Sequence, residues 1–223
     1  MITDLEIIQL VNSQYGHPGS PPVAWDHLDD GTDNDGVYWS VVTQGGFQVV
    51  VLRGSVTTDD FLKDAEAAFW NDRDLGGVHM GFLQGMKDVW SELEPMLKGS
   101  WVACGHSLGA GRADILTALG VVHGKPPASR VVFGEPRPGF AKMCALAAQV
   151  PGRSYRNRDF NGHDVITDVP FTLPPLYPYT RPTPLIDVSE SPAPDDGWSA
   201  FRYHHAELYE KALLKLNPLS ITG

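Results

Sequence analysis

The chain has 223 residues and a formal net charge of −10, and 42% of its residues are hydrophobic while 20% are charged. This composition is typical of a globular protein with a sizeable core, and we expect one domain over residues 1–223. The acidity argues against nucleic acid or an anionic membrane as a partner bound by charge.

No apolar run reaches the ~20 residues that a membrane-spanning helix needs. The N-terminus has the spacing of an amphipathic helix and lacks a signal-peptide pattern, which predicts a cytoplasmic protein. Cys104 and Cys144 are predicted to be buried thiols, with a single disulfide as the alternative. The histidines and cysteines lack metal-ligand spacing, so we expect neither a metal nor another cofactor.

The first hundred residues predict one hairpin, with one helix before it and two helices after it in the chain. Two β-branched runs, residues 36–44 and 47–54, flank Gly45 and Gly46, and this arrangement indicates a β-hairpin. Periodic apolar residues predict helices over residues 5–12, 57–70 and 81–99.

The rest of the chain alternates short apolar runs with helical patterns. We predict buried strands over residues 101–105, 131–134 and 154–158. We predict helices over residues 113–124, 141–150 and 201–216. Residues 170–196 are rich in proline and indicate a loop with one short strand near residues 184–188. Such alternation predicts an α/β fold with a mostly parallel central sheet and helices on both faces.

The segment Gly105-His106-Ser107-Leu108-Gly109 matches the pattern G-x-S-x-G between a predicted strand and a predicted helix. This context indicates a nucleophile elbow, in which a strained turn presents the Ser107 hydroxyl and glycines on either side let neighbouring backbone pass closely. The Leu108 N–H at the start of the helix is then a candidate oxyanion donor. The alternative is a glycine-rich turn with a bystander serine.

Several blocks of sequence resemble the class 3 (fungal-type) lipase family, in the family's order and near its spacing. They are VVVLRGSVTTDDFLKD, VHMGF, ACGHSLGAGRADIL, VVFGEPRPG, DVITDVP and HHAELY. The resemblance implies an α/β-hydrolase fold and the hydrolysis of carboxylic esters, because the family contains lipases, phospholipases and feruloyl esterases. Its departures are LRGS and GEPRPG, where the family usually has FRG followed by Ser or Thr, and GAPRVG.

A serine nucleophile needs a base, usually a histidine that a carboxylate orients, and in this fold both follow the serine in the chain. The acid candidates are Asp159, Asp164, Asp168 and Asp187. Asp164 follows the predicted strand at residues 154–158 and matches the family block that ends at Pro170, so it is our choice, with Asp168 as the alternative.

His204 and His205 are the histidines that follow the proline-rich segment, whereas His123 and His163 come too early. The family's block commonly reads His, four residues, Tyr, and the spacing from His204 to Tyr209 fits it. The resemblance therefore favours His204 as the base, while helical periodicity leaves His205 open.

By the same resemblance, Ser55 is the second oxyanion donor. The sequence predicts a serine carboxylic ester hydrolase, a lipase or an esterase, with the triad Ser107, His204 and Asp164 and an acyl-enzyme intermediate. The alternatives are an acyltransferase with the same triad and a non-catalytic binding module. We expect small-molecule esters of short to medium chain length as substrates, with lipid as a further substrate if residues 57–70 form a lid.

Overall fold

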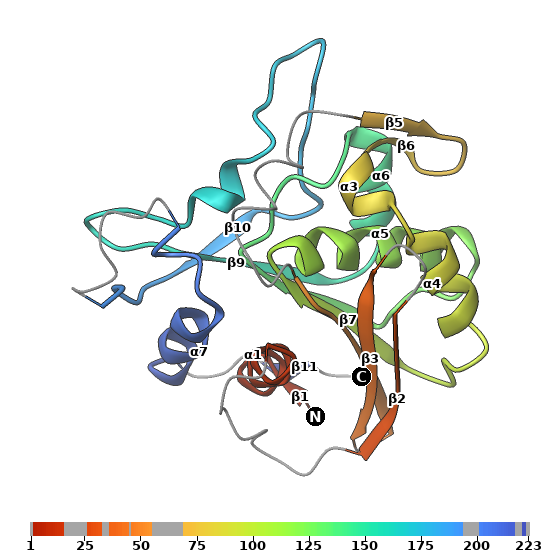
Figure 1. The fold of residues 1–223 in the computed structure, drawn as a ribbon, viewed down its shortest axis with the longest axis horizontal. Helices are drawn as coiled ribbons and strands as arrows, with labels where there is room; N and C mark the ends of the chain where they lie inside the picture. Colours follow the sequence, from red (N-terminus) through yellow and green to blue (C-terminus); the bar gives the residue numbers. More distant parts are fainter. Residues whose placement is uncertain are drawn as a thin grey trace.

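The computed structural model describes residues 2–15, 26–32, 36–44, 46–54, 69–193, 201–216 and 220–221 (Figure 1). In these residues seven strands form one central sheet in the order β10-β9-β8-β7-β4-β3-β2. Its strands are β2 (Asp26–Thr32), β3 (Tyr38–Gln44), β4 (Phe47–Leu52), β7 (Trp101–His106), β8 (Ser129–Phe133), β9 (Gly152–Asn157) and β10 (Leu185–Val188). The helices are α1 (Asp4–Ser13), α3 (Met80–Leu83), α4 (Met86–Leu93), α5 (Leu108–Val122), α6 (Ala141–Ala147) and α7 (Ala206–Leu214), with the 3-10 helix η1 (Val165–Asp168).

The sheet is parallel from β4 through β7, β8 and β9 to β10, and antiparallel where β4 pairs with β3 and β3 pairs with β2. The predicted hairpin, the parallel sheet and the short strand within the proline-rich segment are thus confirmed. Because the parallel strands run in the same direction, the turns that follow β4, β7, β8 and β9 lie together at the carboxyl edge of the sheet.

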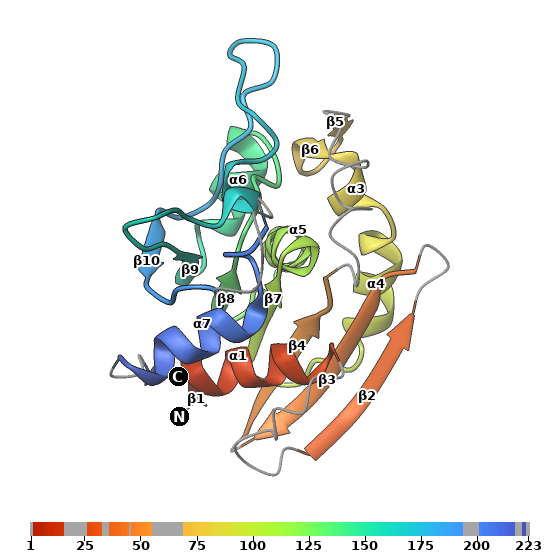
Figure 2. The same ribbon diagram turned by 60° about the vertical axis from the view of Figure 1, so that its left-hand side comes forward.

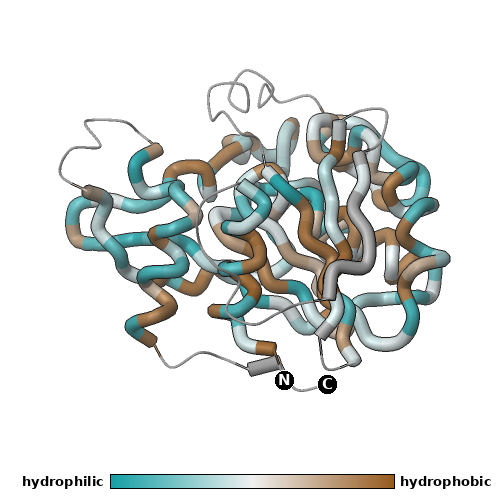
Figure 3. The backbone as a smooth tube through the Cα atoms, turned by 60° about the horizontal axis from the view of Figure 1, so that its bottom comes forward, coloured by the Kyte–Doolittle hydropathy of each residue, from teal (hydrophilic) through white to brown (hydrophobic). Residues whose placement is uncertain are grey.

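Both faces of the sheet are buried along β4, β7 and β8, which explains why these strands are mostly apolar on both faces. Along β4, Val49 and Val51 pack with α1 and α7, while Val50 and Leu52 pack with α3, α4, α5 and α6. Figure 2 shows these two helical layers on opposite sides of the sheet, and Figure 3 shows hydrophobic stretches along the central strands. Cys104 and Cys144 are both free and buried, as the sequence predicts.

The first and the last described residues of the chain pair with each other. Strand β1 (Ile2–Thr3) pairs with β11 (Ser220–Ile221), and α1 packs beside α7. Among the described residues, no helix combines the length and the apolar character needed to cross a membrane.

Three predicted elements differ from the structure. The helix expected over residues 57–70 lies mostly outside the described residues, but Phe69 and Trp70 belong to strand β5 (Phe69–Asp72), which pairs with β6 (Gly76–His79). The helix expected over residues 81–99 is two helices, because Gly85 has a left-handed φ of 75°. The last helix begins at Ala206 instead of residue 201.

The edge strand β2 was missed because its sequence, DHLDDGT, lacks the alternation that marks a strand.

Helix α1 is anchored to the sheet by an ion pair between the buried Asp4 and the partly buried Arg153. The Asp4 carboxylate accepts hydrogen bonds at 2.6 Å from Nε and from Nη2 of Arg153, and a further bond from the Tyr155 hydroxyl. Removing one member of such a pair leaves a desolvated charge without its partner.

Asp4→Asn is therefore expected to lower the free energy of unfolding by about 3 kcal/mol, measured by chemical denaturation. The control is Asp88→Asn, on the exposed first turn of α4, which should cost less than about 1 kcal/mol. Equal losses in the two variants would contradict the anchoring role of Asp4.

Candidate active site

Ser107 lies in the turn between β7 and α5, in a strained backbone conformation. Its φ of 60° is the one positive value at a described non-glycine residue. A Cβ atom at Gly105 would overlap the Gly109 carbonyl, and a Cβ atom at Gly109 would overlap the Leu52 carbonyl. The close backbone passage expected at both glycines is confirmed, and this is the geometry of a nucleophile elbow.

Asp164 and His204 form a buried hydrogen-bonded pair. Asp164 is the N-cap of η1, where its Oδ1 accepts the Ile166 N–H at 2.9 Å. Its Oδ2 lies 2.7 Å from Nδ1 of His204, and the side chains are 0% and 3% exposed. Because a carboxylate accepts, Nδ1 of His204 donates, and in the neutral ring Nε2 carries the lone pair. Nε2 is buried and has no hydrogen-bond partner within the described part of the chain.

The environment of Asp164 keeps its carboxylate ionised. Burial acts to raise its pKa, but interaction with His204 and hydrogen bonds from His204 and Tyr209 outweigh burial and hold the pKa below its ordinary value. A charged Asp164 stabilises the imidazolium that forms when His204 takes up a proton.

The end of β8 brings the serine turn and the Asp164–His204 pair together. The Ser107 N–H donates to the Phe133 carbonyl at 3.1 Å. At the next residue, Gly134, a Cβ atom would lie 2.8 Å from Oδ2 of Asp164 and 2.8 Å from Cε1 of His204. The residue before the serine, His106, stacks its ring on that of His204 with centroids 4.5 Å apart. The Ser107 turn and the Asp164–His204 pair therefore lie at the same end of β8.

The other candidates for acid and base lie in different surroundings. His205 is exposed at the N-cap of α7. Asp168 bonds Nε2 of His163 at 2.7 Å. Asp159 accepts from Tyr203 and Ser191, and Asp187 from Arg156.

The candidate oxyanion donors are Ser55 and the backbone N–H of Leu108. Ser55 lies outside the described residues. Leu108 is the first residue of α5, so its N–H belongs to the first helical turn, where no earlier helical carbonyl pairs with it. Within the described ranges, no group of three or more His, Cys, Asp or Glu side chains is arranged to hold a metal ion.

A comparison with protein families matches residues 49–173 of this chain to the family described as lipase (class 3). The match covers more than half of the sequence and includes Ser107 and Asp164. The chain belongs to the class 3 lipase family. It is thus a serine ester hydrolase with the α/β-hydrolase fold.

Solved structures of lipases have the same fold at low sequence identity. The triacylglyceride lipase of Rhizomucor miehei is 15% identical, with a TM-score of 0.64 over 83% of this chain and 78% of that one. A lipase from Rhizopus microsporus var. chinensis is 19% identical, with a TM-score of 0.64 over 85% and 75%. A triacylglycerol lipase whose catalytic centre is formed by a serine protease triad is 15% identical, with a TM-score of 0.66 over 84% and 80%. No curated protein matches the chain.

Three residues of this class 3 lipase contact the site without having been predicted to do so. The Tyr209 hydroxyl donates to Asp164 Oδ2, a role that the His-x4-Tyr spacing signals. His106 is 5% exposed, and burial followed by repulsion from His204 lowers its pKa to about 3, so it stays neutral. Tyr15, just after α1, contacts the His106 ring. Only the fold brings Tyr15 near the elbow.

Glu135, one of the departures from the family pattern, belongs to a buried polar cluster beneath the site. It accepts from the Ser154 hydroxyl and lies 3.7 Å from Arg130, which also pairs with Asp114. Burial raises the pKa of Asp114 well above its ordinary value, while the paired Arg130 acts to lower it. The cluster joins α5, β8 and β9 through Asp114, Arg130 and Ser154.

The lowered pKa of His106 predicts a loss of stability in acid that His106→Gln removes. The unfolded chain binds a proton at this residue below about pH 6.5, whereas the folded protein binds it only near pH 3. The free energy of unfolding therefore falls as the pH decreases through this window. In His106→Gln the decrease between about pH 7 and about pH 4 should be smaller by several kcal/mol, measured by urea denaturation.

The control for this measurement is His205→Gln, which removes an exposed histidine and should keep the wild-type pH dependence. A wild-type pH dependence in His106→Gln would show that His106 is protonated in the folded protein.

Proposed function

We propose that Ser107, His204 and Asp164 form the catalytic triad with which this class 3 lipase hydrolyses carboxylic esters through an acyl-enzyme. The observation that carries the proposal is the state of His204, which donates Nδ1–H to Asp164 at 2.7 Å and has a buried, unpartnered Nε2. A base in this state is ready to accept a proton. The serine protease triad named for a structurally similar triacylglycerol lipase supports the same assignment.

The reaction follows from these positions. Nε2 of His204 takes the hydroxyl proton of Ser107 as Oγ bonds to the ester carbonyl carbon. The resulting oxyanion accepts hydrogen bonds from the Leu108 N–H and, by family resemblance, from Ser55. The imidazolium then protonates the leaving alkoxide, and an acyl group remains on Ser107. Water, deprotonated by His204, releases the acid and restores the enzyme.

Removal of either Ser107 or His204 should abolish turnover while the fold is retained. Ser107→Ala and His204→Ala are each expected to lower kcat by at least about 10³-fold on a nitrophenyl ester. His205→Ala is the matched control, since its side chain is exposed and lies beside the same helix start. Loss of turnover in His205→Ala, with activity kept in His204→Ala, would move the base by one residue.

The substrate class is indicated by an apolar surface, which we call the crown. Its members are exposed hydrophobic side chains from β5, from the start of α3 and from the segment after η1: Phe69, Trp70, Met80, Phe171, Leu173 and Leu176. Figures 1 and 2 both show these segments projecting beyond the sheet on the same side. Since monomeric proteins rarely expose large apolar patches, the crown favours a partner that is itself apolar.

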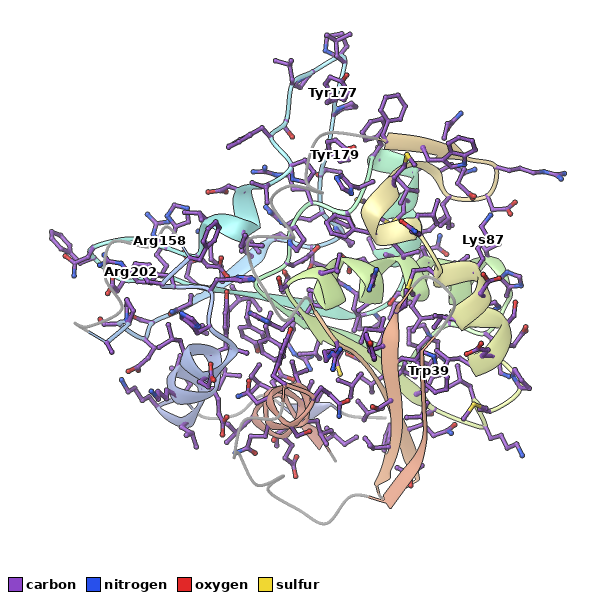
Figure 4. All side chains as sticks on the ribbon, in the orientation of Figure 1. Trp39, Lys87, Arg158, Tyr177, Tyr179 and Arg202 are labelled. Atoms are coloured by element: carbon purple, nitrogen blue, oxygen red, sulfur yellow. The ribbon has the colours of Figure 1, made fainter. Side chains whose placement is uncertain are left out.

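The segment that carries half of the crown has a defined structure. Leu173 and Tyr177 exchange two backbone hydrogen bonds of 2.8–2.9 Å, and the Thr180 N–H donates to the Gly139 carbonyl at 2.8 Å. Figure 4 shows Tyr177 far out on this segment and Tyr179 at its base. The Tyr177 ring contacts Phe69 of β5, which joins the two parts of the crown. We therefore extend the proposed substrates from soluble esters to aggregated lipid.

Substitutions in the crown should distinguish aggregated from dissolved substrate. Phe171→Ser with Leu176→Ser is expected to lower the rate on an emulsified triacylglycerol at least about 10-fold and to leave hydrolysis of dissolved nitrophenyl acetate unchanged, because the apolar burial of these two side chains is lost only at a lipid surface. Phe160→Ser is the control, as Phe160 is fully exposed and lies outside the crown. A wild-type rate on the emulsion in the double variant would show that the crown does not contact lipid.

A further inference from the structure

We propose that Tyr15 and His106 are positioning residues that hold the end of β4, the Ser107 turn and the loop of His204 in one fixed arrangement. The proposal rests on the triad above and assigns a role to two buried side chains that the reaction steps do not use. Neither residue reaches the reacting atoms. They act on the site through the backbone and ring of their neighbours.

Three hydrogen bonds in series connect the segments. The Gly54 N–H, just after β4, lies 3.1 Å from the Tyr15 hydroxyl. That hydroxyl lies 3.2 Å from Nδ1 of His106, and Nε2 of His106 lies 2.7 Å from the carbonyl oxygen of His204. Four stretches of chain that are distant in sequence are thereby joined at the carboxyl edge of the sheet.

The direction of each bond follows from its endpoints. The His204 carbonyl only accepts, so Nε2 of His106 donates. A neutral imidazole carries one N–H, so Nδ1 of His106 accepts from the Tyr15 hydroxyl. The hydroxyl oxygen accepts in turn from the Gly54 N–H. One protonation state thus satisfies the whole series.

His106 also restricts the ring of the base. Its imidazole stacks on that of His204 at 4.5 Å with an interplanar angle of 30°, while Asp164 holds the edge of the same ring through Nδ1. The backbone carbonyl, one face and one edge of His204 are therefore all fixed. Rotation of the ring would carry Nε2 away from the Ser107 turn, and a small misplacement of a catalytic group costs rate more than it costs binding.

Close packing around Gly54 adds a reason for precise placement. A Cβ atom at Gly54 would lie 2.6 Å from the His106 carbonyl oxygen and 3.2 Å from Cβ of Ser107. The strand end therefore touches the serine turn directly. The Tyr15 hydroxyl bonds both partners of this contact, so its loss should let them shift relative to one another.

Two substitutions of His106 separate its bonds. The Gln side chain places its amide near Nε2 of histidine and retains donation to the His204 carbonyl, whereas the shorter Asn amide lies near Nδ1 and loses it. We expect His106→Asn to lower kcat on a nitrophenyl ester about 10- to 100-fold, and His106→Gln to lower it less than about fivefold. The KM of both variants should stay within about twofold of wild type.

Tyr15→Phe should lower kcat about fivefold at unchanged KM, because one hydrogen bond to each of two segments is lost. Tyr155→Phe is its matched control: it also removes a buried tyrosine hydroxyl, one that donates to Asp4 away from the site. This control should lose thermal stability and keep the wild-type kcat. A circular dichroism melt of every variant verifies that it is folded at the assay temperature.

The outcomes separate this proposal from the proposed function. Turnover in Ser107→Ala or His204→Ala, run in the same assay, means that the triad itself is misassigned. If those variants are inactive while His106→Asn and His106→Gln have equal kcat, or while Tyr15→Phe behaves as Tyr155→Phe does, the positioning role is overturned and the triad stands.

Discussion

The backbone of Ser107 is held at a φ of 60°, a strained conformation that the contacts of the surrounding structure stabilise. The turn packs so closely that Gly105 and Gly109 have no room for a side chain, and it is tied to the end of β8 by the hydrogen bond from Ser107 to Phe133. Flanking strands buried on both faces give it rigid support. The serine therefore stands at the edge where the other parallel strands also end, and the Asp164–His204 pair lies at the same edge.

The same edge carries polar groups with little access to water, and their protonation states are fixed by their partners. Asp164 remains charged because His204 and Tyr209 donate to it, whereas His106 remains neutral because it is buried beside His204. A low local dielectric strengthens both effects. His204 thus donates to a charged carboxylate, while the neutral ring of His106 donates to the His204 carbonyl, although both rings belong to the same stacked pair.

The sequence predicted the features that depend on residues close together in the chain. The apolar strands and the glycines around Ser107 follow from periodicity and sterics. The order serine, acid, histidine came from the fold, and Asp164 and His204 were chosen by family resemblance; the structure places these two side by side. Residues 81–99 failed as one helix because Gly85 adopts a left-handed conformation within an otherwise periodic pattern. The contacts of Tyr15 and the grouping of the crown residues could not be predicted in this way, since they join segments that are distant in sequence. Ser55 remains a prediction from family resemblance.

The most direct test of the account is covalent labelling of the native enzyme with an alkyl organophosphonate, read by intact mass and by peptide mapping. The account predicts a single adduct on Ser107, formed at a rate that falls by orders of magnitude in His204→Ala, because the base must take the hydroxyl proton for the phosphorus to be attacked. An adduct on another residue, or equally fast labelling of Ser107 without His204, would contradict it.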